Sequence, residues 1–236
     1  LTPGNSNELN NGIGAQLNCT SALSISVQPI SQSDCKGNNV DFSVSYSPIT
    51  TVNYQWQIST DNGIAWSNIV GASGSASASP ITYTASNIGV NNTNTNATQY
   101  RIIISNAGCS DTSDAAMLTV NEIKGITPQN TQTTICEGGS FTFTATTSGS
   151  SPVSYQWLKN STALADGTVN GVTISGANTA TLTVTNASPS ETGAYKVRII
   201  FNVIDGSGVS KTCQITSQLI RNVTVNPKPT PTIYHN

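Results

Sequence analysis

The chain has 236 residues, only 8% of them charged, and its formal net charge is −2. Its nine Lys and Arg residues are scattered, so no basic surface is expected that would bind nucleic acid or an anionic membrane. No apolar run approaches the roughly 18 residues that a membrane-spanning helix needs, and we expect no membrane span.

Residues 1–24 form an N-terminal segment without the basic and apolar regions of a signal peptide. We expect any export signal to have been removed or to lie outside the given sequence. Cys19 precedes Thr-Ser and an alternating strand, as Cys109 and Cys213 do, so the segment resembles the last strand of a preceding repeat. Cys19 is therefore expected to be unpaired in this scheme, with an upstream cysteine, an intermolecular bond and a buried free thiol as alternatives.

Apolar and polar residues alternate with a period of two through most of the chain. The alternating positions are Val40, Phe42, Val44, Tyr46, Phe141, Phe143, Leu182, Val184, Val197, Ile199, Val223 and Val225. Such alternation is typical of antiparallel strands with one buried face, and no helical spacing sustains ten residues. The sequence predicts an all-β protein.

Two copies of one pattern follow each other along the chain. Cys35 and Cys136, like Trp56 and Trp157, are separated by the same offset of 101 residues (136 − 35 and 157 − 56). The sequence predicts two tandem domains, residues 25–120 and 125–226. A linker is expected at 121–128, and a Pro-rich linker to a next repeat at 227–236.

In each copy the order of cysteine, tryptophan and tyrosine indicates an immunoglobulin-like β-sandwich. Trp56 and Trp157 are expected to fill the two cores from the third strand, and Tyr195 in "ETGAYKV" matches a tyrosine corner. Tyr100 keeps the tyrosine in the first copy without the preceding acid and glycine. Asn62-Gly63 predicts a two-residue hairpin turn.

The five cysteines indicate disulfides and an exported protein. We expect one bridge in each domain, Cys35–Cys109 and Cys136–Cys213, each contributing roughly 4 to 5 kcal/mol in the chain-entropy account. With no Cys-x-x-Cys pair and with a single histidine, His235, no metal site and no cofactor are expected.

Catalysis is not expected from this chain, because its eleven acidic residues are dispersed among predicted turns and suggest no paired carboxylates. Trp66 is interpreted as packing against its own sheet, and its alternative role is an exposed aromatic contact for a ligand.

The run Y-Q-W-Q-x-S-T-D-x-G-x-x-W-x-x-I at Tyr54–Ile69 resembles the Ig-like repeats of very large secreted surface proteins of Bacteroidota. The entry at Gln28–Gly37, the exit at Leu118–Asn121 and the closing "VTVNPKPTPTI" share this resemblance. It implies an extracellular or cell-surface location and kinship with gliding-motility adhesins exported by the type IX system. After Trp157 the second copy departs from the pattern.

The expected function is a non-catalytic structural or adhesive module, a stalk or fibre segment in surface adhesion or gliding. Its expected partners are neighbouring Ig-like repeats or other copies of itself, and a surface polysaccharide or protein ligand is a further candidate. Two alternatives stay open: a carbohydrate- or protein-binding accessory module of a secreted enzyme, and a self-assembling extracellular fibre subunit that uses strand exchange.

Overall fold

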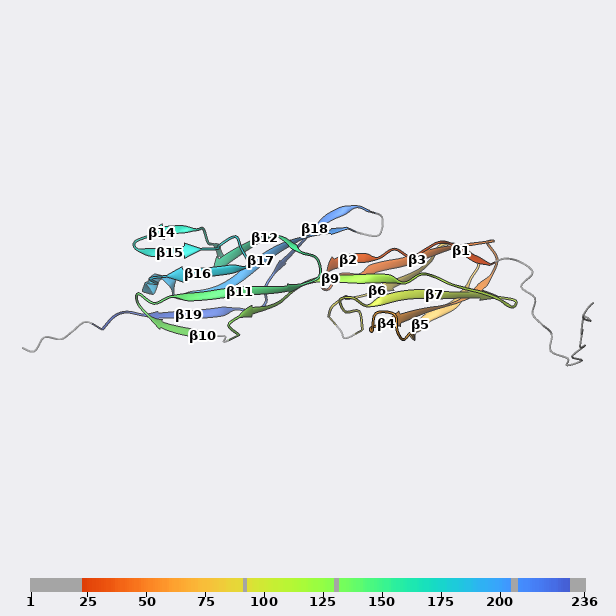
Figure 1. The fold of residues 1–236 in the computed structure, drawn as a ribbon, viewed down its shortest axis with the longest axis horizontal. Helices are drawn as coiled ribbons and strands as arrows, with labels where there is room; N and C mark the ends of the chain where they lie inside the picture. The colour runs from red at the N-terminus through yellow and green to blue at the C-terminus, as the bar shows by residue number, and fades with distance from the viewer. Residues whose placement is uncertain (1–22, 91–92, 130–131, 205–207, 230–236) are drawn as a thin grey trace, which may run out of the picture.

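The computed structural model describes residues 23–90, 93–129, 132–204 and 208–229. The molecule is elongated and consists of two lobes placed end to end (Figure 1). Strands form nearly all its regular structure, with one short 3-10 helix, η1 (Pro189–Glu191), so the all-β prediction is confirmed. Within the described ranges, no helix is long and apolar enough to cross a membrane.

The N-terminal lobe, residues 23–121, has two layers of strands. The first layer has the order β1-β3-β6, and the second pairs β2 with β9 and continues through β7 and β4 to β5. The strands are β1 (Ser24–Val27), β2 (Gln32–Cys35), β3 (Val40–Ser47), β4 (Val52–Ser59), β5 (Ser67–Ala76), β6 (Ile81–Ala85), β7 (Gln99–Asn106), β8 (Cys109–Thr112) and β9 (Ala116–Thr127).

The C-terminal lobe, residues 122–229, repeats this arrangement. One layer runs from β9 through β11 and β16 to β15 and β14, and the other has the order β10-β19-β17-β12-β13, with β18 paired to β17. The strands are β10 (Gln132–Cys136), β11 (Phe141–Ser148), β12 (Pro152–Lys159), β13 (Thr162–Ala163), β14 (Gly167–Val169), β15 (Val172–Ser175), β16 (Thr181–Thr185), β17 (Gly193–Ile204), β18 (Ser210–Thr216) and β19 (Arg221–Asn226).

Each lobe has its own hydrophobic core between its two layers. The alternating apolar residues of β3 and β11 point inward because successive side chains of a strand face opposite sides of the sheet. Trp56 and Trp157 are fully buried, one at the centre of each core. The Trp157 indole N–H donates to the Thr179 carbonyl at 3.0 Å, whereas that of Trp56 finds no partner among the described residues.

A buried tyrosine lies near the start of an equivalent strand in each lobe, Tyr100 in β7 and Tyr195 in β17. In the C-terminal lobe the Tyr195 hydroxyl donates to the Glu191 carbonyl at 2.8 Å, four residues upstream. In the N-terminal lobe the Tyr100 hydroxyl donates instead to the side-chain oxygen of buried Asn94, at 2.8 Å. The side chain of Asn94 therefore takes the place of a backbone acceptor where the acid and the glycine are missing.

Strand β9 belongs to both lobes. Its first residues pair with β7 and β2 in the N-terminal lobe, and its last residues pair with β11 in the C-terminal lobe. Residues 121–127, expected as part of a linker, are therefore strand. The prediction of a linker is wrong because the backbone stays paired across this segment, Asn121 with Cys35 of β2 and residues 122–127 with β11. The apolar alternation of Leu118 and Val120 is interrupted at Glu122 and Lys124, and this interruption suggests a linker.

Candidate functional site

Outside the cores, a disulfide and several buried polar contacts join the two lobes at a junction. The disulfide is the first of these contacts. Cys35, the last residue of β2, forms a disulfide with Cys213 in β18 of the C-terminal lobe, with 5.7 Å between their Cα atoms. Figure 1 shows the β17–β18 hairpin extending from its own lobe toward the end of β2. The bond therefore joins the two lobes.

The predicted pairs Cys35–Cys109 and Cys136–Cys213 are wrong. Cys136 is a free, exposed thiol, and Cys109 is disulfide-bonded, but not to Cys35. Cys19 lies outside the described residues.

Strand direction explains this error. Cys35 pairs with Asn121 in β9, at the junction, whereas the antiparallel strand β7 leaves the junction and reaches Cys109 at its far end. A strand of this length spans about 25 Å at roughly 3.3 Å per residue, far beyond the Cα separation of a disulfide. In the C-terminal lobe, Cys136 and Cys213 lie at opposite ends of the sheet for the same reason.

The second component of the junction is Asn121, which is fully buried in β9. Its amide nitrogen donates to the Ser33 hydroxyl at 3.0 Å and to the Asp34 carbonyl at 3.1 Å, both in the N-terminal lobe. Its amide oxygen accepts from the Ser150 backbone N–H of the C-terminal lobe at 2.7 Å. One side chain thus connects both lobes and satisfies its buried polar atoms by doing so.

Gly149 allows this contact. It has a φ of +95°, and a Cβ at this position would lie 2.6 Å from both the Asn121 side-chain oxygen and the Val120 carbonyl. A larger residue would be strained by its backbone conformation and would also push against Asn121.

The third component is a group of ion pairs around Glu122, which is buried directly after Asn121. Its carboxylate binds Lys36 of the N-terminal lobe at 2.8 Å, and it also binds Lys124 of β9. Burial alone would raise the pKa of Glu122, but the hydrogen bonds and charges of Lys124 and Lys36 outweigh burial and lower it. The carboxylate is thus charged at neutral pH and joins β9 to the loop that follows β2.

A fourth contact lies beside the disulfide. The Lys211 ammonium, from β18, binds the buried carboxylate of Asp34 at 2.7 Å. The other oxygen of Asp34 accepts from the Cys35 backbone N–H at 2.7 Å and from the Asn38 amide at 2.9 Å. Asp34 and Lys211 also border an open hollow of about 450 Å³, with Gln32 and Asp41 on its walls.

Trp66 is half-buried and does not lie at the junction. The guanidinium of Arg101 covers its ring at 4.2 Å, and its indole N–H donates to the Gly63 carbonyl at 3.1 Å. The two-residue turn predicted at Asn62-Gly63 is wrong: both residues have positive φ, but they lie in a longer loop, residues 60–66, between β4 and β5. These contacts agree with the interpretation that Trp66 packs against its own sheet.

The acidic residues of the described part of the chain form no group of three or more potential metal ligands with cysteine or histidine. His235 lies outside the described residues. The acids with the clearest environments have structural partners: Glu191 accepts from the Ser188 backbone N–H and hydroxyl at the start of η1, at 3.0 and 2.7 Å.

The strand order of both lobes is that of an immunoglobulin-like sandwich. One layer holds strands A, B and E, which are β1, β3 and β6 in the N-terminal lobe and β9, β11 and β16 in the C-terminal lobe. The other layer holds strands A′, G, F, C and C′, which are β2, β9, β7, β4 and β5 and, in the C-terminal lobe, β10, β19, β17, β12 and β13; the β17–β18 hairpin belongs to the F–G connection. Residues 123–199 match the family described as Immunoglobulin domain. No curated protein matches the chain.

Solved structures similar to the chain have low sequence identity. Sidekick-1 immunoglobulin domains 1–5 are 15% identical with a TM-score of 0.44, covering 86% of this chain and 38% of that one. The titin I-band fragment I67–I69 is 16% identical with a TM-score of 0.45, covering 87% and 66%. A Dscam isoform structure is 12% identical with a TM-score of 0.39, covering 88% and 46%. The chain thus spans between 38% and 66% of the length of these structures.

Proposed function

We propose that the chain consists of two immunoglobulin-like domains in tandem, corresponding to the two lobes, and that it is a non-catalytic stalk segment of a cell-surface or secreted protein. In this role it sets the distance and direction between whatever lies on either side of it and transmits mechanical load. The observation that carries the proposal is the junction, where a disulfide connects the two lobes.

Several features of the junction support a load-bearing role. Strand β9 passes through it and is paired in both lobes, so backbone hydrogen bonds hold the lobes together beside the disulfide. The Cys35–Cys213 bond closes a loop of 178 residues, which contains most of both cores. Force applied at the chain ends would pass through the disulfide and leave this loop unloaded. Disulfides are also typical of exported proteins, which supports an extracellular or cell-surface location.

The resemblance of Tyr54–Ile69 to repeats of Bacteroidota surface proteins extends this proposal to an adhesin-type parent exported by the type IX system. Neighbouring Ig-like repeats are the proposed partners. A second role, binding of a polysaccharide, has one specific observation in its favour. A shallow hollow of about 290 Å³ over β4, β5 and β7 is lined by Tyr54 and by the amides of Asn53, Gln57 and Asn68. Aromatic and amide side chains suit the faces and hydroxyls of sugars.

Single-molecule pulling on the chain ends tests the stalk function. In the oxidised chain the segment between Cys35 and Cys213 should stay closed, because the force bypasses it. After reduction it should add about 600 Å of contour length, at roughly 3.4 Å per residue for 178 residues. Cys136→Ser is the matched control and should behave as the unaltered chain. An oxidised chain that releases the full length would contradict the load-bearing role.

A further inference from the structure

Cys136 lies at the outer end of the C-terminal lobe, where it is free and exposed. It is the last residue of β10, and its position can be compared with that of Cys35 in β2. Both strands pair in parallel with the last strand of their own lobe. Cys35 lies opposite Asn121, and Cys136 lies opposite Asn226. The two cysteines therefore occupy the same register position in the two lobes.

The chain also turns in the same way after each cysteine. The backbone N–H of Lys36 donates to the Asn121 carbonyl at 3.0 Å, and that of Glu137 donates to the Asn226 carbonyl at 2.8 Å. The next residue is a glycine at positive φ in both lobes, +91° for Gly37 and +86° for Gly138.

Each of these glycines then donates at 2.8 Å to a loop that follows an equivalent strand, Gly37 to the Ile88 carbonyl after β6 and Gly138 to the Ala187 carbonyl after β16. We call the turn after each cysteine, together with the asparagine opposite that cysteine, the corner of its lobe. The two corners have the same backbone hydrogen bonds.

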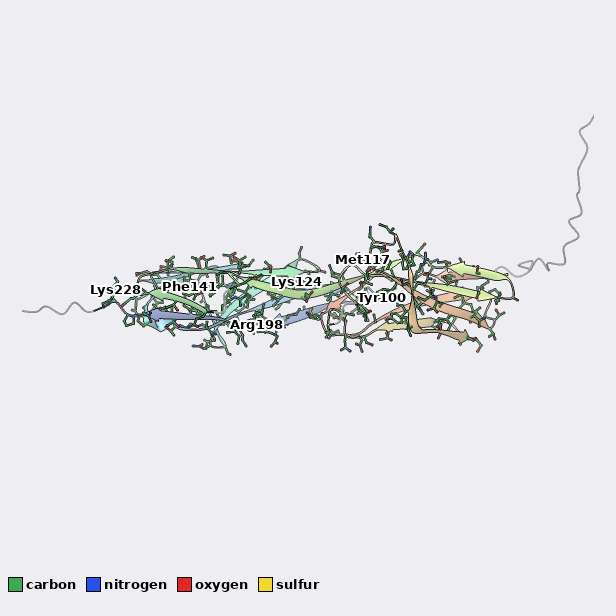
Figure 2. The ribbon with its side chains drawn as sticks, turned by 90° about the horizontal axis from the view of Figure 1, so that it is seen from below. Tyr100, Met117, Lys124, Phe141, Arg198 and Lys228 are labelled. Carbon is green, nitrogen blue, oxygen red and sulfur yellow. A yellow bond between two sulfur atoms is a disulfide. The ribbon has the colours of Figure 1, made fainter. Side chains whose placement is uncertain are left out.

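The two corners differ in whether another lobe is packed against them. The corner of the N-terminal lobe is covered by the next lobe, whose Cys213 bonds Cys35 and whose Ser150 N–H binds Asn121. At the corner of the C-terminal lobe the equivalent residues, Cys136 and Asn226, are both exposed. Lys228 marks this end of the molecule in Figure 2, away from Lys124 near the junction.

We propose that this outer corner is the docking surface for a further immunoglobulin-like lobe, and that Cys136 forms a disulfide with a cysteine on the F–G hairpin of that lobe. The inference rests on the proposed stalk function and names the partner of this end. Asn226 is assigned the role of Asn121: its amide accepts a backbone N–H from the arriving lobe. The same kind of disulfide would then join successive lobes, each time from the end of the A′ strand of one lobe to the F–G hairpin of the next.

The bond forms by oxidation of two thiols. Cys136 and the hairpin cysteine together give up two electrons and two protons to a disulfide oxidant, such as oxidised glutathione, which becomes two thiols. Ile135 stands at the register position of Asp34, so this corner lacks the carboxylate that binds Lys211. The hairpin that fits it is therefore expected to carry an apolar residue, rather than a lysine, two positions before its cysteine.

The test uses residues 1–226 followed directly by a second copy of residues 122–236, so that Asn226 enters the appended lobe as Asn121 enters the natural one. The appended copy carries Lys211→Leu, because Ile135 stands where Asp34 binds Lys211 at the natural junction. The chain is refolded in a glutathione redox buffer, and its unreduced peptides are mapped by mass spectrometry. We expect a peptide pair that joins Cys136 to the Cys213 of the appended copy. The number of free thiols should then equal that of the 236-residue chain.

Two more free thiols per molecule, or a bond from Cys136 to any other cysteine, would overturn the proposal. The matched control carries Cys136→Ser, and its appended Cys213 should react with a thiol reagent. In the 236-residue chain itself Cys136 must be labelled in the native state, and a thiol that stays inert there would overturn the proposal independently. If this inference alone is wrong, the pulling behaviour of the 236-residue chain is unchanged, so the two failures can be told apart.

Discussion

Removal of the disulfide between the lobes should destabilise the protein strongly, because the bond closes most of the chain into one loop. Cys35→Ser with Cys213→Ser replaces the bond with two small polar side chains. The bond closes a loop of 178 residues, and the chain-entropy relation gives about 5 kcal/mol for a loop of this length at 25 °C. This value is an upper bound, since it applies to unfolding of both lobes together.

The assay is equilibrium unfolding in guanidinium chloride, followed by the fluorescence of the two core tryptophans. Trp56, together with half-buried Trp66, reports on the N-terminal lobe, and Trp157 reports on the C-terminal lobe; Trp56 and Trp157 are each fully buried in their own core. We expect the double variant to unfold at a lower denaturant concentration and in two separate steps, because only non-covalent contacts and the shared strand β9 then couple the two lobes. Cys136→Ser, which removes an exposed free thiol, should unfold like the unaltered chain. A double variant with an unchanged midpoint and a single transition would refute the reasoning.

Three further changes test other parts of the structure. Trp157→Phe should cost about 1 kcal/mol more than Trp56→Phe in denaturant unfolding, because only Trp157 loses an indole hydrogen bond, to Thr179; equal costs would contradict this. Gly149→Ala should lower the melting temperature of the chain by several degrees, since its Cβ would meet the Asn121 side-chain oxygen and the Val120 carbonyl at 2.6 Å; an unchanged melting temperature would contradict the close approach. Glu122, whose pKa is lowered on folding, stabilises the folded chain above its ordinary pKa of 4.5, and this contribution is lost as the pH falls through the folded pKa. Glu122→Gln should therefore weaken the loss of stability below pH 4.5, and an identical pH profile would contradict the role of this carboxylate.

The sequence was sufficient to predict the parts of the fold that depend on local patterns. Alternation along β3 and β11 indicates strands with one buried face, and the repeated Tyr-Gln-Trp indicates the core tryptophans, which the structure places at Trp56 and Trp157. These inferences succeed because side-chain direction in a strand depends only on residue spacing.

The junction could not be predicted, because it depends on where distant segments meet. The order of the cysteines indicates one disulfide in each lobe, but the strand directions place the two cysteines of each predicted pair at opposite ends of their sheet. Asn121 gave no signal of its own, since one asparagine in an Asn-rich chain is not distinctive. The internal repeat does contain a trace of the junction: Asn121 and Asn226 each end a "TVN" run, and Cys35 and Cys136 occupy the same register position.

The central claim, that the junction holds the two lobes in a fixed relation, can be measured most directly by pulsed electron paramagnetic resonance. Spin labels are placed through encoded ketone side chains at exposed Val70 and Val169, one in each lobe, which leaves the cysteines unchanged. A control pair at Val153 and Val169 lies within the C-terminal lobe. The account predicts a distance distribution between the lobes as narrow as that of the control, and broader once the disulfide is reduced. A distribution between the lobes that is already broad in the oxidised chain, and unchanged by reduction, would contradict it.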